Sequence, residues 1–153
     1  MQRVLFLCTG NYYRSRFAEI FFNWHAEQRN LAWRAESRGL AIDPVNPGPL
    51  SRHTRARLEG HRIDYAEYLR FPLDLSLIDL EKAHRIVAVK RAEHFPLMQR
   101  RFPEWSERVE FWDVHDIDCL EPDESMPVLE TRVIDLLTEL ERRTPSTDSR
   151  ARS

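Results

Sequence analysis

Cysteine is scarce in this sequence, because Cys8 and Cys119 are the only two among 153 residues. Two thiols are too few to cross-link a secreted fold by several disulfides or to build a four-thiolate metal site. Long apolar runs are also missing: the longest aliphatic and aromatic runs, 4–7 and 86–89, are far shorter than the roughly 20 residues that a membrane-spanning helix needs. The first residues contain no signal-peptide core. We therefore expect a cytoplasmic protein whose thiols stay reduced.

The chain also lacks an excess of charge of either sign. Its 23 Lys and Arg residues and 25 Asp and Glu residues give a formal net charge of −2. This balance provides no bulk attraction for nucleic acid or an anionic membrane, so neither is expected as a partner, and any anion site must be local. The length predicts a single domain over residues 1–142. Residues 143–153, mostly Ser, Thr, Arg and Asp, are predicted to form a disordered tail.

Hydrophobic patterning predicts four strands that alternate with helices. The continuous apolar runs 4–7 and 86–89 are typical of strands in a parallel sheet, and 33–37 and 109–112 are predicted as two further strands. Helical spacing or capping residues predict helices over 17–30, 51–60, 76–82, 92–100 and 129–140. This alternation predicts an α/β fold, a three-layer sandwich with a central four-stranded parallel sheet and helices on both faces. Ligands bind such sheets at the carboxyl ends of the strands, which directs attention to the loop after Leu7.

That loop, residues 8–15, reads Cys-Thr-Gly-Asn-Tyr-Tyr-Arg-Ser between a predicted strand and a predicted helix. The unpaired N–H groups and the dipole of a helix N-terminus favour negative charge, and successive loop N–H groups can enclose a tetrahedral oxyanion. The same field stabilises the thiolate, the nucleophilic form of Cys8. Arg14 offers a planar fork to two anion oxygens. We therefore predict an oxyanion site in which Cys8 is a nucleophile.

The other loop residues are predicted to shape this site. Gly10 is free of Cβ crowding, and Asn11 tolerates left-handed dihedral angles and can brace the loop. The hydroxyl of Ser15 lies where it can donate to the sulfur. The residues predicted to bind phosphate or substrate are Thr9, Gly10, Asn11, Tyr12, Tyr13 and Ser15.

Segment 4–15 closely resembles the phosphate-binding loop of the low-molecular-weight protein tyrosine phosphatases. Segment 36–40, Glu-Ser-Arg-Gly-Leu, resembles the second-strand Ser-Ala-Gly segment of that family, and segment 60–64 resembles its Gly-Ile-Asp turn. Residues 86–89 match its third strand, and the resemblance extends to about Arg142. It implies a phosphatase that hydrolyses phosphomonoesters, phosphotyrosine or other phosphorylated protein side chains, through a phosphocysteine on Cys8 and without a metal or organic cofactor.

The resemblance also implies a general acid, an Asp between the last strand and the last helix. The matching segment 112–119, Trp-Asp-Val-His-Asp-Ile-Asp-Cys, offers three candidates. Asp116 has the best offset from the strand end and is our prediction, followed by Asp118 and then Asp113. The implied partners are a phosphorylated protein or a small phosphomonoester, with inorganic phosphate or another oxyanion in the loop.

Several departures from the family pattern stand out. Tyr13 replaces a second loop cysteine, which removes disulfide protection within the loop. Arg16 replaces the usual Pro. The acid segment has no Asp-Pro and no Asp-Pro-Tyr-Tyr run, so Tyr12 is the candidate for one wall of the pocket, and the preference for phosphotyrosine stays open.

Other residues have simpler interpretations. Cys119 and His115 have no companions for a metal site, although Cys119 is a minor candidate for a resolving thiol. The histidines outside the acid segment are scattered and are predicted to face solvent or to cap helices. The basic stretch 52–57, Arg-His-Thr-Arg-Ala-Arg, is predicted to be a solvated helix face, with docking of phosphoproteins as the alternative.

Two other functions compete with the phosphatase hypothesis. Arsenate mimics phosphate, so an arsenate reductase that uses an external thiol is possible; an all-internal version needs cysteines that residues 13–118 lack. A module that binds phosphoproteins without hydrolysing them would also fit the missing Asp-Pro and the bulky Tyr12 and Tyr13.

Overall fold

The computed structural model describes residues 1–116 and 121–143. Within these residues, four parallel strands form one sheet in the order β2-β1-β3-β4. The prediction of a four-stranded parallel sheet is therefore confirmed. The strands are β1 (Gln2–Cys8), β2 (Trp33–Gly39), β3 (Arg85–Ala88) and β4 (Glu110–Phe111).

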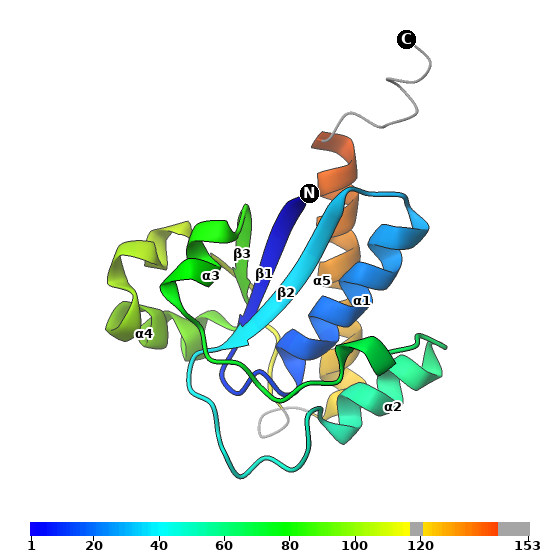
Figure 1. The fold of residues 1–153 in the computed structure, drawn as a ribbon, viewed down its shortest axis with the longest axis horizontal. Coiled ribbons are helices and arrows are strands. Elements are labelled where there is room, and N and C mark those ends of the chain that lie inside the picture. The colour runs from blue at the N-terminus through cyan, green and yellow to red at the C-terminus, as the bar shows by residue number, and fades with distance from the viewer. Residues whose placement is uncertain (117–120, 144–153) are drawn as a thin grey trace.

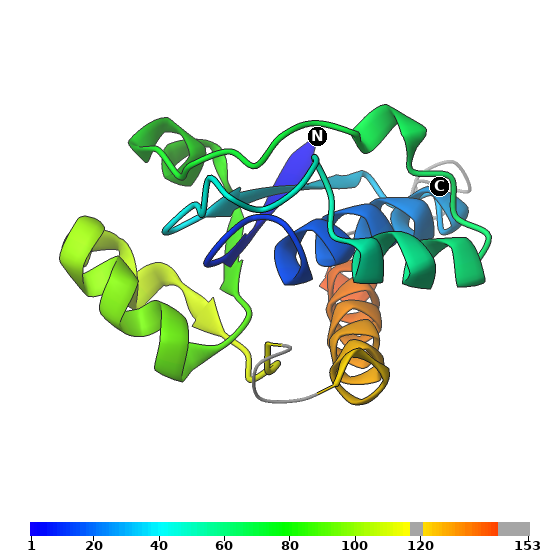
Figure 2. The same cartoon turned by 90° about the horizontal axis from the view of Figure 1, so that it is seen from below.

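Helices cover both faces of the sheet, as the three-layer prediction requires. Figures 1 and 2 show α1, α2 and α5 on one side of the sheet and α3 and α4 on the other. The helices are α1 (Arg14–Gln28), α2 (Arg52–Gly60), α3 (Leu77–Lys82), α4 (Arg91–Arg101) and α5 (Pro122–Arg143), with short 3₁₀ segments η1 (Ala66–Tyr68) and η2 (Pro103–Arg108).

The central strand β1 divides the core into two layers. Val4 and Phe6 pack with α1 and α5, whereas Leu5 and Leu7 point to the opposite face and pack with residues of α3 and α4. Alternate side chains of a strand point to opposite faces, so a strand with helices on both sides must be apolar throughout. This requirement explains the continuous apolar run at the start of the sequence.

The helices follow the expected local rules. The predicted apolar stripe of the last helix is buried, and α5 begins seven residues before it, at Pro122. Ser51 caps α2, because its Oγ accepts a hydrogen bond from the backbone N–H of His53 at 3.1 Å. The helix predicted over 17–30 begins earlier, at Arg14, and ends at Gln28. Its start directly after the loop places the N-terminus of α1 beside the predicted anion site.

The last described residue, Arg143, is still helical. The rest of the predicted tail, residues 144–153, lies outside the described residues. Among the helices of residues 1–116 and 121–143, none combines the length and the apolar character that crossing a bilayer requires.

Candidate active site

The loop from Cys8 to Arg14 lies at the carboxyl edge of the sheet. β1 ends at Cys8, which is paired with Gly39 at the end of β2, and α1 begins at Arg14. The backbone N–H groups of Leu40 and Ala41 donate to the carbonyl oxygens of Cys8 and Thr9 at 3.0 and 2.9 Å. These bonds tie the beginning of the loop to the chain that leaves β2.

The sulfur of Cys8 receives hydrogen bonds from within its own loop. Its Sγ lies 2.9 Å from Ser15 Oγ, and the backbone N–H of Asn11 donates to it at 3.2 Å. The side-chain Nδ2 of Asn11 donates to the same Ser15 oxygen at 2.9 Å. Because this bond occupies a lone pair of Ser15, its hydroxyl proton is free to donate to a thiolate at Cys8. Two donors therefore stabilise negative charge on the sulfur.

Asn11 holds the loop in a left-handed backbone conformation. Its φ is 50°, a region that Asn adopts more readily than most residues. Its Nδ2 also donates to Ser37 Oγ at 2.9 Å, and its Oδ1 accepts from Arg70 Nη1 and from the backbone N–H of Leu73, both at 3.0 Å. The buried amide is thus fully hydrogen-bonded and holds the loop in place from its buried side.

Arg70 belongs to this brace but was not among the predicted site residues. It also donates from Nη2 to the carbonyl oxygen of Ser37 at 3.0 Å, and this Nη2 lies 3.7 Å from Glu19 Oε1. Burial and the nearby charge of Arg16 lower the pKa of Arg70 to about 10, against the opposing influence of Glu19. No loop motif in the sequence points to Arg70, since it lies 59 residues from Asn11.

The guanidinium of Arg14 is almost completely buried beside the loop. Its Nη1 donates to the carbonyl oxygen of Val114 at 2.9 Å, and its Nη2 donates to Glu93 Oε2 at 2.8 Å and lies 3.5 Å from Asp116 Oδ2. Burial opposes the charged form, but the negative charges of Cys8, Asp116 and Glu93 outweigh it and raise the pKa of Arg14. Arg14 therefore stays a cation in a fixed orientation.

Glu93 connects Arg14 to two other side chains. Besides Arg14, its Oε2 accepts a hydrogen bond from Thr9 Oγ1 and lies 3.1 Å from His94 Nε2. Burial works against ionisation of Glu93, but hydrogen bonds from His94, Arg14 and Thr9 hold the pKa of its carboxyl far below the usual range. Glu93 is therefore a carboxylate that faces the loop from α4.

His94 is fully buried, so the prediction that it faces solvent is wrong, whereas the alternative that it caps a helix holds, because it binds Lys90, the N-cap residue of α4. The backbone N–H of Lys90 donates to Nδ1 at 3.1 Å, which leaves the proton of the neutral ring on Nε2, toward Glu93. Burial lowers the pKa of His94 and keeps the ring neutral. Sequence position could have indicated that these two residues lie near the site. Glu93 and His94 follow the predicted strand 86–89, and the ends of parallel strands meet at the sheet edge where the loop lies.

The structure separates two of the three predicted acid candidates. Asp116 lines the pocket that contains Cys8, with about a third of its side chain exposed. Asp113 instead lines a different surface pocket beside Phe95 and Phe111. Asp118 and Cys119 lie outside the described residues. Asp116 is therefore the described candidate that shares a pocket with Cys8 and Arg14.

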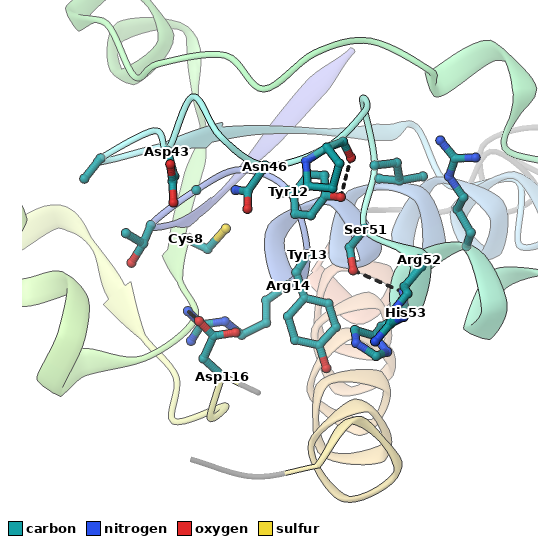
Figure 3. A pocket seen from close by; sticks show the side chains of 16 residues that line it. Cys8, Tyr12, Tyr13, Arg14, Asp43, Asn46, Ser51, Arg52, His53 and Asp116 are labelled. Carbon is teal, nitrogen blue, oxygen red and sulfur yellow. Dashed lines mark hydrogen bonds and ion pairs between the residues drawn. The ribbon is translucent and has the colours of Figure 1, made fainter. Parts of the chain in front are cut away.

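The pocket has a volume of about 690 Å³ and extends from the loop to the beginning of α2 (Figure 3). Thr9, Gly10, Tyr12 and Tyr13 contribute to its wall, whereas Asn11 and Ser15 are buried behind it. Segment 41–51 supplies the facing wall, with Asp43, Asn46 and Pro47 among its lining residues.

The two loop tyrosines have different contacts. Tyr12 donates from its hydroxyl to the carbonyl oxygen of Pro47 at 2.5 Å and so joins the loop to the facing wall. Tyr13 is buried, with its hydroxyl 3.2 Å from Ser125 Oγ of α5 and its ring against His53. Burial raises the pKa of Tyr13. Tyr12 therefore lines the pocket as predicted. Tyr13 also lines it, but packs against α2 and α5.

The basic stretch 52–57 is only partly the solvated face that was predicted. Arg52, His53 and Arg55 line the pocket, and Thr54 is buried with its hydroxyl donating to the carbonyl oxygen of Tyr13 at 3.0 Å. The prediction of a solvated face is therefore wrong for Thr54, whereas Arg52 is exposed to solvent at the pocket. In the part of the chain that the structure describes, no cluster of three or more His, Cys, Asp or Glu residues could hold a metal ion.

Comparisons with known proteins agree with this geometry. Residues 3–146 match the model of a family described as low molecular weight phosphotyrosine protein phosphatase. A search of curated proteins returns no match.

Solved structures share the fold at low identity. YfkJ from Bacillus subtilis is 22% identical with a TM-score of 0.82, over 95% of this chain and 98% of that one. A low molecular weight protein tyrosine phosphatase from T. tengcongensis is 22% identical with a TM-score of 0.73, over 94% and 100%. The YwlE arginine phosphatase from Geobacillus stearothermophilus is 22% identical with a TM-score of 0.74, over 94% and 95%.

Proposed function

Because the chain belongs to the low molecular weight phosphotyrosine protein phosphatase family, whose members are cysteine-dependent hydrolases, we propose that it hydrolyses phosphorylated protein side chains through a phosphocysteine on Cys8. One observation carries this proposal: Cys8 Sγ accepts hydrogen bonds in a pocket that also contains the buried cation Arg14 and the carboxyl group of Asp116. A nucleophile, an oxyanion-binding group and a proton donor are the groups that this reaction needs.

In the first step, the thiolate of Cys8 attacks phosphorus in line with the leaving oxygen. The S–P bond forms while the P–O bond to the substrate breaks. The loop N–H groups and Arg14 hold the three equatorial oxygens, and Asp116 gives its proton to the leaving oxygen. The dephosphorylated side chain leaves with that proton, and Asp116 becomes a carboxylate.

In the second step, the carboxylate of Asp116 takes a proton from a water molecule that attacks the phosphocysteine. The S–P bond breaks, inorganic phosphate forms, and the electron pair returns to Cys8 as a thiolate. The hydroxyl of Ser15 and the N–H of Asn11 lie where they stabilise that leaving sulfur. The chain returns to its starting state with no net redox change.

The substrate class includes phosphotyrosine and a second candidate, phosphoarginine. The latter is supported by similarity to an arginine phosphatase structure and by Asp43 and Asp116, two carboxylates that line the pocket near Cys8 (Figure 3). Carboxylates on both sides of the sulfur would suit a cationic leaving group. Hydrolysis rates of matched phosphotyrosine and phosphoarginine peptides distinguish the two.

The central experiment is hydrolysis of p-nitrophenyl phosphate in the presence of a chelator. We expect turnover by the wild-type protein, inhibition by vanadate and no turnover by Cys8→Ser. Cys119→Ser is the matched control and should retain activity. Wild-type turnover no greater than that of Cys8→Ser would overturn the proposal. Thiol consumption that depends on arsenate would instead indicate a reductase, and tight phosphopeptide binding without hydrolysis would indicate a binding module.

A further inference from the structure

The basic side chains of α2 fall into two groups. Arg57 is engaged by Glu130 of α5, to which its Nε and Nη2 donate at 2.7 and 2.9 Å. Arg52, His53 and Arg55 instead line the pocket that contains the phosphate-binding loop. Three neighbouring basic residues thus contribute to a pocket for which the proposed reaction needs only one cation, that of the loop itself.

These basic residues lie at a distance from the sulfur, along the pocket. Figure 3 shows Cys8 and Asp116 at one end. Arg52 and His53 lie at the other end, with Tyr13 between the two groups. The pocket therefore has a reaction end with two acidic side chains, Asp43 and Asp116, and a basic end formed by the first turn of α2.

In the part of the chain that the structure describes, the basic end of the pocket is not ion-paired. Among residues 1–116 and 121–143, no carboxylate forms an ion pair with Arg52, His53 or Arg55, in contrast to Arg57. The Nε of Arg55 is buried without a hydrogen-bond acceptor in the same part of the chain. Because a guanidinium is always charged and a buried donor favours an acceptor, this wall would be stabilised by an anionic group from a ligand.

We propose that Arg52, His53 and Arg55 form a subsite for an anionic side chain, a carboxylate or a second phosphate, on the polypeptide that carries the scissile phosphate. This inference rests on the proposed function and specifies its substrate class: phosphorylated segments with an acidic residue close to the phosphorylated one. The pocket volume of about 690 Å³ lies near the middle of the usual range for ligand pockets, which leaves room for groups besides the scissile phosphate.

The test compares phosphopeptides that differ only in the residues flanking the phosphorylated one. Flanking pairs of Glu, Ala or Lys are placed on either side, and one further peptide carries a second phosphate as phosphoserine. For the wild-type protein, we expect kcat/KM to be about tenfold higher with Glu than with Lys, and this ratio to fall as salt is added. A larger gain with phosphoserine than with Glu assigns the subsite to a second phosphate.

The variant Arg52→Glu/Arg55→Glu should reverse the ratio in favour of Lys. Because each ratio compares kcat/KM for two peptides with the same protein, a general loss of activity cancels. Arg100→Glu, an exposed substitution on α4, is the matched control and should keep the wild-type ratio. Equal kcat/KM for all peptides, or the same change in the control, would overturn the subsite.

Failure of the subsite and failure of the proposed function give different results. A protein that hydrolyses p-nitrophenyl phosphate but shows no preference among peptides lacks only the subsite. If no substrate is hydrolysed, binding of the same peptides to Cys8→Ser, followed by fluorescence anisotropy, still tests the preference. Acidic peptides should then bind about tenfold more tightly than basic ones, and equal affinities would overturn the inference.

Discussion

The Nη2 of Arg14 lies 2.8 Å from Oε2 of Glu93, so the cation assigned to the phosphoryl oxygens is already paired with a carboxylate. The carbonyl oxygen of Val114 accepts a bond from Nη1 at 2.9 Å. A guanidinium has five N–H bonds, and these two contacts fix its plane while leaving the others for a phosphate. Glu93 therefore orients Arg14 but also places a negative charge near the site of a dianion.

The variant Glu93→Gln separates these two effects. We expect kcat to fall about tenfold because Arg14 is oriented less firmly. Inhibition by inorganic phosphate should become several-fold stronger, because a like charge near the bound anion is removed. Initial rates with phosphate as a competitive inhibitor measure both. Glu104→Gln, exposed on η2, is the control. A parallel loss of turnover and phosphate affinity would contradict this role.

The loop and the residues that surround it differ in how far the sequence could predict them. Cys8, Asn11, Arg14 and Ser15 all lie within the eight-residue segment 8–15, and their residue types and order already predict an oxyanion site. Glu93 lies 79 residues from Arg14, and its role depends on which sheet edge it occupies. Strand patterning predicted that edge, but which side chain of a helix turns toward the loop is decided by tertiary packing.

The variant Asp116→Asn should slow hydrolysis of phosphopeptides by about 10²- to 10⁴-fold, because an amide cannot protonate the leaving oxygen. The loss should be smaller for an aryl phosphate with a strongly acidic leaving group, since that oxygen needs less protonation. Rates across a series of leaving groups measure the difference. Asp113→Asn is the matched control, because Asp113 lines a separate pocket. If Asp113→Asn is the impaired variant, the acid is misassigned.

Acidification should destabilise the protein through His94. Burial lowers its pKa in the folded state below about 6.5, the ordinary value that the unfolded chain retains. The unfolded state therefore binds more protons as the pH falls below about 6.5, and the free energy of unfolding decreases. His94 faces Glu93 and Thr9, with Arg14 and Asp116 nearby. The lowered pKa of Glu93 adds a further loss only below about 4.5.

Urea denaturation at pH 7.5 and pH 5.5 measures this effect. We expect a free energy of unfolding lower by about 1 kcal/mol at pH 5.5 for the wild-type protein. His94→Gln keeps an N–H donor toward Glu93 but does not titrate, so its difference between the two pH values should be smaller. His25, whose pKa burial also lowers, contributes with the same sign in both proteins. An equal pH dependence in both would refute the assignment to His94.

The basic stretch shows another limit of sequence reasoning. A helix was predicted over 51–60, and the structure has α2 over Arg52–Gly60 with Ser51 as its N-cap. Periodicity alone could not show that Arg57 pairs with Glu130 of α5 while Arg52 faces the pocket, because both depend on how α2 packs. Helical spacing indicates which residues share a face, but it does not identify the neighbour of that face.

Gly39 determines how closely the end of β2 approaches the loop from Cys8 to Arg14. A Cβ at this position would lie 2.9 Å from the carbonyl oxygen of Thr9, 3.1 Å from Cβ of Asn11 and 2.5 Å from Cδ1 of Ile42. The end of the Ile42 side chain can move aside. The Thr9 oxygen cannot move freely, because it is backbone and accepts the hydrogen bond from Ala41 at 2.9 Å. Added volume at residue 39 must therefore displace the loop.

We expect Gly39→Ala to lower kcat by at least about tenfold, because displacement of the loop by a fraction of an ångström misaligns its N–H groups and Cys8. The free energy of unfolding should fall by about 1–3 kcal/mol from overpacking. Gly60→Ala is the matched control: no atom lies within 4 Å of its added Cβ, and this helical position should gain up to about 1 kcal/mol. Activity assays well below both melting temperatures separate catalysis from unfolding. Full activity of Gly39→Ala would show that the loop accommodates the methyl group without losing its geometry.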